Sequence, residues 1–233
     1  MKRPRLVNEQ IYHIYNRGVE KRSIFLEDND YFRFIHNLFE FNDEMPAQNI
    51  YYRNLYEVGP RKVRKSRENH ERKLLIEILA FCLMPNHFHL LVKQKVDNGI
   101  SKFVQKLSTG YSMYFNQKYK RVGPLFQGKF KAVLVDEENH FIHLPFYIHL
   151  NPLDLIAPEW RNREIEDYQK ALKFLKFYRW SSYLDYIGEK NFPSVTQRDF
   201  LLDFFGDSQN YKVQTEQWLK DIDLSAIEEL IIE

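Results

Sequence analysis

The apolar and polar pattern in the first third of the chain predicts a strand, a helix and an insertion. Residues 11–16 are β-branched and aromatic and end at Arg17-Gly18, which is typical of a strand entering a turn. Residues 28–42 begin with candidate Asp and Asn caps and continue with helical apolar spacing. Residues 43–73 lose this periodicity and carry a basic run, so we interpret them as an insertion.

The middle of the chain predicts a β-hairpin. Residues 74–83 are nearly all apolar, as in a strand covered on both faces, although a buried helix fits the same pattern. Met84-Pro85-Asn86 interrupts this run, and residues 87–94 resume as a second strand. The further elements that we expect are a helix capped by Ser101 and running to about Lys120, a strand over 129–135, a helix capped by Asp136 and ending at Asn151-Pro152, a helix over 163–176, and short helices beyond Pro193.

This order of elements suits an α+β sandwich with a central antiparallel sheet and helices on its faces. The chain has 233 residues, of which 44% are hydrophobic and 16% aromatic, so it can bury a sizeable core. We expect one compact domain over residues 1–190, with the insertion at 43–73, and a C-terminal helical extension over residues 191–233.

The sequence also limits where the protein acts and how it could bind metal. It has no apolar run long enough to cross a bilayer and no apolar stretch of a signal peptide at the N-terminus, so we expect a soluble, cytoplasmic protein. Cys82 is the only cysteine, which excludes intramolecular disulfides and thiolate zinc sites. A metal would therefore need histidine, carboxylate or amide ligands.

The net charge of +2 conceals an uneven distribution of charge. Residues 100–135 contain no Asp or Glu and interleave cations with aromatic rings, the combination that single-stranded nucleic acid requires of a surface. A solvated basic helix with its aromatic residues in the core fits the same composition. The candidate DNA contacts are Lys129 and Lys131 first, then Arg17, Lys120 and Arg121.

Two histidines in the second strand of the hairpin are candidates for metal binding. Residues two apart in a strand point to the same face, so His87 and His89 should project together. A pair of imidazoles completed by oxygen ligands would accept magnesium or manganese. A histidine pair of this kind is, by itself, more often structural or solvent-facing.

A polar stripe on the expected helix at 137–151 offers a nucleophile. Residues four apart share a helical face, so His143, Tyr147 and Asn151 should line up, with His140 near the start of the stripe. A tyrosine aimed at a metal-held phosphate can attack it through its phenolic oxygen. Viewed singly, Tyr147 also fits a half-buried aromatic residue, and Asn151 a helix-terminal residue before proline.

The same helix has an apolar side that should pack on the sheet. Phe141, Leu144 and Ile148 follow helical spacing and form this side. Pro145 removes a helical hydrogen bond two residues before Tyr147, so it should kink the helix or mark a later start.

Five stretches of the chain together form a recognisable pattern over roughly residues 10–190. They are YHIYNRGVEKRSIF at 12–25, AFCLMPNHFHLLVKQ at 80–94, GPLFQGKFKAVLV at 123–135, YIHLNP at 147–152 and RWSSYLDYIG at 179–188. In these stretches the chain resembles the single-tyrosine HUH transposases, in particular the REP-associated branch related to the IS200-like enzymes. The combination of MPNHFHLL with YIHLNP is specific.

The resemblance implies a ferredoxin-like fold, with His87 and His89 as metal ligands on the central sheet. It implies that Tyr147 is the nucleophile, that Asn151 is the third ligand, and that Mg²⁺ or Mn²⁺ is the cofactor. The family cleaves single-stranded DNA beside a hairpin through a 5′-phosphotyrosine link and later rejoins it, so the protein would be associated with the nucleoid. Insertion-sequence members act as homodimers, whereas REP-associated members can be monomers.

Two other functions remain open at this point. A domesticated regulator of the same fold could bind hairpin DNA without transposition, although the histidines, Tyr147 and Asn151 are all present. A metal-dependent hydrolase of small phosphoesters would use Tyr147 only to orient its substrate, but it would not need the long cationic and aromatic window.

Overall fold

A computed structural model of the protein describes residues 4–45, 72–162, 164–221, 224 and 227. Residues 46–71, the greater part of the insertion expected over 43–73, lie outside the described residues.

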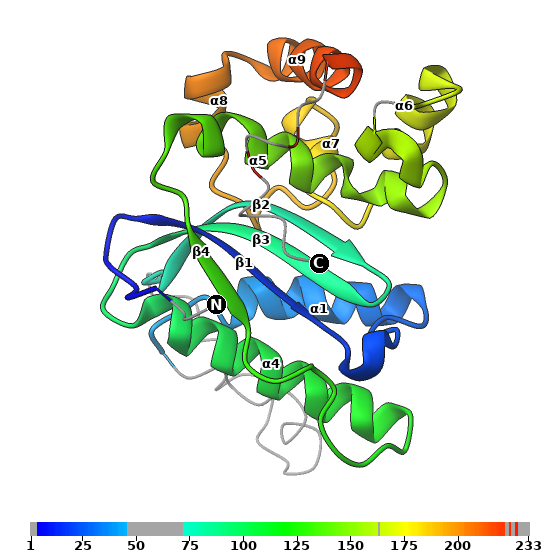
Figure 1. Ribbon diagram of the computed structural model, residues 1–233. Helices are drawn as coiled ribbons and strands as arrows, with labels where there is room; N and C mark the ends of the chain where they lie inside the picture. Colours follow the sequence, from blue (N-terminus) through cyan, green and yellow to red (C-terminus); the bar gives the residue numbers. More distant parts are fainter. Residues whose placement is uncertain (1–3, 46–71, 163, 222–223, 225–226, 228–233) are drawn as a thin grey trace, which may run out of the picture.

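A four-stranded antiparallel sheet forms the centre of the fold (Figure 1). Its strand order is β2-β3-β1-β4, with antiparallel pairing between all neighbours. The two-residue link between β2 and β3 forms the expected hairpin, and the predicted α+β class is confirmed. The strands are β1 (Ile11–Arg17), β2 (Ile76–Met84), β3 (His87–Gln94) and β4 (Lys131–Leu134).

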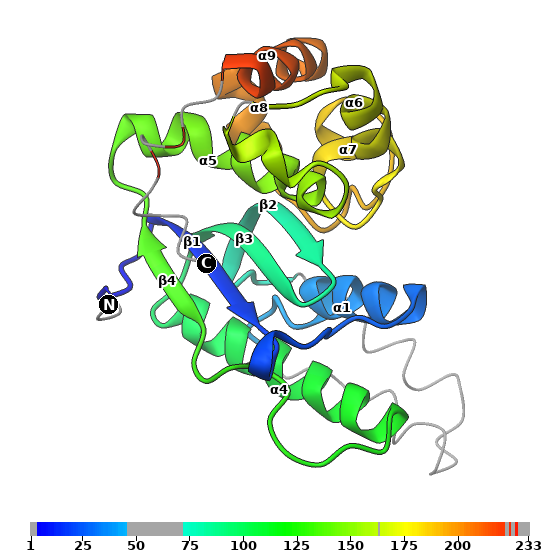
Figure 2. The same ribbon diagram turned by 45° about the vertical axis from the view of Figure 1, so that its right-hand side comes forward.

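Two helical layers cover the opposite faces of this sheet. Helices α1 (Asp28–Glu40) and α4 (Gly99–Lys118) lie on one face, and α5 (Glu138–Leu150) lies on the other with the C-terminal helices (Figures 1 and 2). The alternation of side chains along β3 separates the layers: Phe88 packs on the α1 side, whereas His89 faces α5.

Several helix and strand boundaries differ from those that the sequence predicts. Helix α4 begins at Gly99 after Asn98, not after Ser101, because the buried Gln94 side chain accepts a hydrogen bond from the Ile100 N–H at 3.2 Å. Helix α5 follows Glu137, not Asp136. Strand β4 is shorter than the expected 129–135. Helix α6 (Tyr168–Phe177) begins later than the expected residue 163, because the Asp167 carboxylate caps it.

The C-terminal part of the chain packs against α5. As predicted, short helices follow Pro193, and Phe146 of α5 lies 5.0 Å from the Phe205 ring and 5.2 Å from the Tyr211 ring, measured between centroids. Phe141 contacts Phe200, Phe204 and Phe205 instead of the sheet, which corrects the expected apolar side of α5. These elements are η2 (Asn151–Leu155), η3 (Pro158–Asn162), α7 (Tyr183–Tyr186), α8 (Asp199–Phe205) and α9 (Ser208–Asp221).

No helix in the part of the chain that the structure describes is both long and apolar enough to span a membrane.

Candidate active site

The two histidines of β3 lie side by side on the face of the sheet that α5 covers. The rings of His87 and His89 are 4.8 Å apart between centroids and nearly perpendicular. The two-residue period of the strand therefore brings both imidazoles together, as the sequence predicted. His89 is only 3% exposed, so its environment is largely that of the protein interior.

The His87 ring is oriented by the residue before it. Its Nδ1 lies 2.6 Å from the side-chain oxygen of Asn86. An amide oxygen can only accept, so Nδ1 carries a proton, and in the neutral form of the ring the lone pair lies on Nε2. The amide nitrogen of Asn86 donates to the Lys21 carbonyl at 3.2 Å, which sets the orientation of the amide. Lys21 and the preceding Glu20 both have positive φ, at 58° and 57°.

His89 is held from the neighbouring strand by a residue that the sequence did not single out. His13 of β1 is fully buried, and its Nε2 lies 2.9 Å from the His89 Nδ1. Burial, followed by the charges of His87, His13 and Arg161, holds the pKa of His89 well below its usual value. His89 is therefore a neutral imidazole, which is the form that binds metals. Its Nε2 is buried and forms no hydrogen bond within the described residues.

The phenol of Tyr147 meets this histidine pair from α5. Its ring packs edge-on to the His89 ring at 5.9 Å between centroids. The side chain is fully buried, and its hydroxyl oxygen accepts a hydrogen bond from Arg161 at 3.2 Å. One chain therefore brings together the predicted nucleophile and the predicted metal histidines.

Asn151 ends α5 one turn after Tyr147. Its backbone N–H donates to the Tyr147 carbonyl, and its side chain is fully buried. Neither polar atom of its amide forms a hydrogen bond with the described residues. The rest of the expected stripe takes other partners: His143 accepts from the Trp218 indole at 2.7 Å, and His140 lies 3.7 Å from Glu137.

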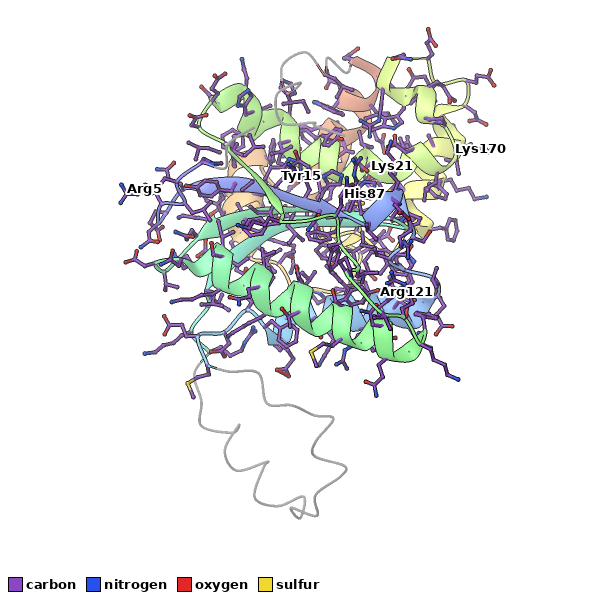
Figure 3. The ribbon with its side chains drawn as sticks, turned by 60° about the horizontal axis from the view of Figure 1, so that its bottom comes forward. Arg5, Tyr15, Lys21, His87, Arg121 and Lys170 are labelled. Atoms are coloured by element: carbon purple, nitrogen blue, oxygen red, sulfur yellow. The ribbon has the colours of Figure 1, made fainter. Side chains whose placement is uncertain are left out.

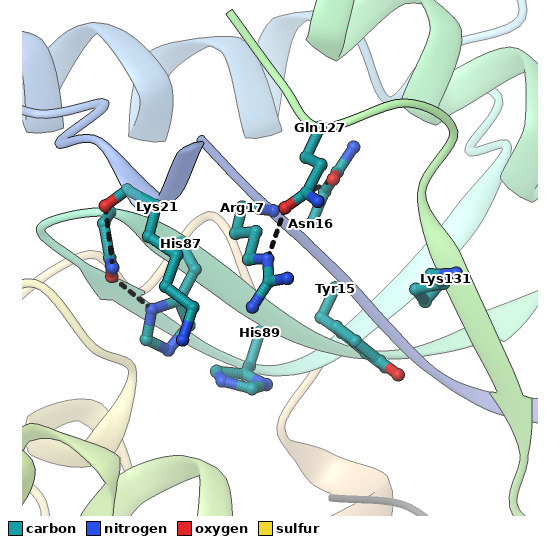
Figure 4. A pocket seen from close by; sticks show the side chains of 9 residues that line it. Tyr15, Asn16, Arg17, Lys21, His87, His89, Gln127 and Lys131 are labelled. Carbon is teal, nitrogen blue, oxygen red and sulfur yellow. Dashed lines mark hydrogen bonds between the residues drawn. The ribbon is translucent and has the colours of Figure 1, made fainter. Parts of the chain in front are cut away.

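A pocket of about 400 Å³ opens over the histidines (Figure 4). The side chains of Arg17 and Lys21 extend towards the imidazoles, and Gln127 accepts from Arg17 Nε at 2.6 Å. Of the predicted DNA contacts, Arg17 and Lys131 line this pocket. Its lining residues are Tyr15, Asn16, Arg17, Lys21, Asn86, His87, His89, Gln127 and Lys131.

The other predicted DNA contacts, Lys120, Arg121 and Lys129, are not among the lining residues. In Figure 3, Tyr15, Lys21 and His87 gather on one side of the sheet, whereas Arg121 lies at the end of α4 on the other side. The acid-free window is therefore divided between two faces of the protein.

Many residues of that window have structural partners on the α4 side. Lys118 forms ion pairs of 2.6 Å with both Asp30 and Glu27, and Lys106 donates to the Asp43 carbonyl at 2.6 Å. Tyr111 and Phe115 are buried in the core. For these residues, the alternative of a basic helix with core aromatic side chains is correct.

The position of the tyrosines limits the choice of nucleophile. On the α4 side, Tyr111 donates to the Ile24 carbonyl, and Tyr114 and Tyr119 donate to Asp30 at 3.0 and 2.7 Å. Tyr15 is a second phenol near the imidazoles, because its ring lies 6.0 Å from that of His89 and lines the pocket. Burial raises the pKa of Tyr15 despite the opposing charge of Arg17, so it stays protonated at neutral pH.

Fold and site together define an α+β protein whose sheet presents a histidine pair to a tyrosine-bearing helix. A solved structure described as the REP-associated tyrosine transposase bound to a REP hairpin is similar over 85% of this chain and 92% of that chain, with a TM-score of 0.50 and 14% sequence identity. A comparison with curated proteins finds no match.

The family model of the IS200-like transposases matches residues 52–151, which include the histidine pair, Tyr147 and Asn151. The predicted resemblance is thereby confirmed: residues 52–151 are similar to the IS200-like transposases, and the fold is similar to that of the solved REP-associated tyrosine transposase.

Proposed function

We propose that this protein is a metal-dependent single-stranded-DNA endonuclease and strand transferase with Tyr147 as its nucleophile. The observation that carries the proposal is the 5.9 Å approach between the rings of Tyr147 and His89. A tyrosine beside a histidine pair combines a nucleophile with a candidate metal site, the two parts of covalent phosphoryl transfer at a metal.

His87, His89 and Asn151 would hold Mg²⁺ or Mn²⁺. His89 Nε2 and both polar atoms of the Asn151 amide are buried without hydrogen bonds among the described residues. In the neutral form of His87, the hydrogen bond at Nδ1 places the lone pair of the ring on Nε2. Imidazole and amide oxygen suit these ions when water or phosphate oxygens complete the shell. The ion would polarise the scissile phosphate and offset its growing negative charge.

The reaction exchanges one phosphodiester for another. The Tyr147 oxygen forms a bond to phosphorus, and the bond from phosphorus to the 3′-oxygen breaks. The phenol loses its proton and the departing 3′-hydroxyl gains one. A later attack by a 3′-hydroxyl on the phosphotyrosine reverses these steps, so cleavage and rejoining need no external energy source.

The pocket supports a DNA substrate. Arg17, Lys21 and Lys131 are three cations beside the histidines, and they suit the phosphates on either side of the scissile bond. Hairpin DNA is the proposed substrate because the similar solved structure is described as bound to a REP hairpin. We propose Lys120, Arg121 and Lys129 as outer contacts with the same strand.

We further propose that residues 1–190 form the catalytic unit and that residues 191–233 are an extension that supports α5. Contacts of Tyr211 and Trp218 with α5 support this division. Because one chain supplies both Tyr147 and the histidines, a monomer would hold a complete site.

The decisive test compares Tyr147→Phe with Tyr15→Phe, the matched phenol in the pocket. The probe is a 3′-labelled oligonucleotide that contains the palindromic repeat nearest the gene with single-stranded flanks. With Mn²⁺, wild type and Tyr15→Phe should form a labelled covalent adduct, whereas Tyr147→Phe should bind the probe without forming one. An adduct in Tyr147→Phe that is absent in Tyr15→Phe would reassign the nucleophile.

Two additions test the remaining parts of the proposal. Chelator should abolish the adduct. A mixture of Tyr147→Phe and His87→Ala should stay inactive if each chain supplies its own site, and recovered activity would show exchange of the tyrosine between subunits. Binding without any adduct in the wild type would favour a DNA-binding regulator.

A further inference from the structure

An arginine outside the predicted site contacts the reacting oxygen of Tyr147. Arg161 lies on η3, and its Nη1 donates to the Tyr147 hydroxyl at 3.2 Å. The guanidinium also lies 5.3 Å from the centre of the Tyr147 ring. Tyr147 therefore meets a permanent positive charge on the side where its hydroxyl lies.

The same guanidinium is fixed by a carboxylate. Arg161 Nε and Nη2 donate to the two oxygens of Asp154 at 2.9 and 2.6 Å, a two-point contact that sets both the position and the plane of the guanidinium. Asp154 is fixed in turn by the indole of Trp160, which donates to it at 2.6 Å. Trp160 is fully buried and lies 5.2 Å from the guanidinium.

We propose that Arg161 is a positioning residue for the Tyr147 nucleophile and that Asp154 holds Arg161 in place. This inference rests on the proposed function. A guanidinium has donors but no acceptor, so in its hydrogen bond with the phenol the oxygen lone pairs must accept. The hydrogen bond strengthens as the oxygen loses its proton, and it directs the anionic oxygen before attack.

The pair of Arg161 and Asp154 is suited to this role because its side chains need little reorganisation when the Tyr147 oxygen becomes charged. Two donors of Arg161 are committed to Asp154, and a third remains for Tyr147. The side chains of Arg161 and Asp154 are only 20% and 21% exposed, so solvent weakens their attraction less than at an open surface. Preorganised donors of this kind act where charge develops in the transition state.

The test measures the rate of adduct formation separately from DNA affinity. The full chain with Mn²⁺ and the 3′-labelled repeat oligonucleotide is used at saturating protein. Arg161→Ala should slow the reaction by roughly 10- to 100-fold, the loss expected for one charge-assisted hydrogen bond. Arg161→Lys should recover part of this loss, and Asp154→Asn should slow the reaction less than Arg161→Ala. The dissociation constant of the oligonucleotide should change little.

Arg179→Ala is the matched control. Arg179 stacks on aromatic rings, including Trp180 at 5.3 Å, but belongs to a different cluster, so its loss should leave the rate unchanged. Thermal unfolding and Mn²⁺ titration verify that each variant keeps its fold and its metal site. If Arg161→Ala fails to fold, Arg161→Gln and Asp154→Asn provide the same comparison.

A second measurement does not depend on activity. In protein labelled with 3-fluorotyrosine, the Tyr147 resonance is identified by its loss in Tyr147→Phe. Arg161→Ala should shift this resonance, whereas Arg179→Ala should not.

Three results would overturn the inference: an unshifted Tyr147 resonance in Arg161→Ala, a wild-type rate in Arg161→Ala, or a rate loss that only follows weaker DNA binding. A faster reaction also overturns it, because Arg161 would then restrain Tyr147. An absent wild-type adduct refutes the proposed function, while the fluorine signal still reports the contact.

Discussion

Replacing His13 by phenylalanine should weaken metal binding at His89 without removing the ring that stacks on it. The two rings lie 5.1 Å apart and nearly parallel, and phenylalanine preserves that packing. What it removes is the 2.9 Å contact between His13 Nε2 and His89 Nδ1. If His89 binds the ion through Nε2, its proton lies on Nδ1 and donates to His13.

The magnitude follows from the burial of this pair. His13 is fully buried and His89 is 3% exposed, so water does not readily replace the lost acceptor. Loss of such a partner typically lowers metal affinity by about 10- to 100-fold, or about 1.4 to 2.7 kcal/mol. His13→Gln offers a side-chain oxygen as acceptor and should recover part of the affinity.

Calorimetric titration of the metal-free full chain with Mn²⁺ measures this effect directly, with no need for DNA. His36→Phe is the control, because His36 is an exposed histidine on α1, on the other side of the sheet. His87→Ala gives the Mn²⁺ affinity that remains when one proposed metal ligand is missing. If His13→Phe binds Mn²⁺ as tightly as wild type, His13 does not orient the ligand and the reasoning is refuted.

Two further predictions concern salt and pH. Replacing Arg17 or Lys131 by glutamine should reduce the slope of log affinity against log salt concentration by about 0.7 for single-stranded DNA, whereas Lys102→Gln on α4 should leave the slope unchanged. Equal slopes in all three variants would contradict a DNA strand that passes through the pocket. Burial lowers the pKa of His149 from 6.5 to about 3. Below pH 6.5 the unfolded chain takes up a proton that the folded chain does not, so stability falls on acidification, by about 2 kcal/mol between pH 7 and pH 5. His89, whose pKa is also lowered, adds a loss of the same sign in both proteins, so denaturant titrations in chelator should show a loss about 2 kcal/mol smaller in His149→Gln than in wild type. Equal losses in the two proteins would contradict the prediction.

Local spacing was enough to predict the elements that carry the candidate site. The apolar run of β2, the break at Pro85-Asn86 and the two-residue period of His87 and His89 are properties of neighbouring residues. The same holds for Tyr147 and Asn151, which are one helical turn apart. Helix starts were less predictable, because α4 is capped by Gln94 from the end of a strand.

Tertiary structure alone decided what surrounds those residues. Pairing of β1 with β3 brings His13 to His89 from 76 positions away, and the turn after α5 returns Arg161 to Tyr147. The division of the basic window between two faces likewise follows from the packing of α4 against the sheet. Periodicity within a segment determines which side of its own helix or strand a side chain occupies, whereas the partner on that side depends on how distant segments pack.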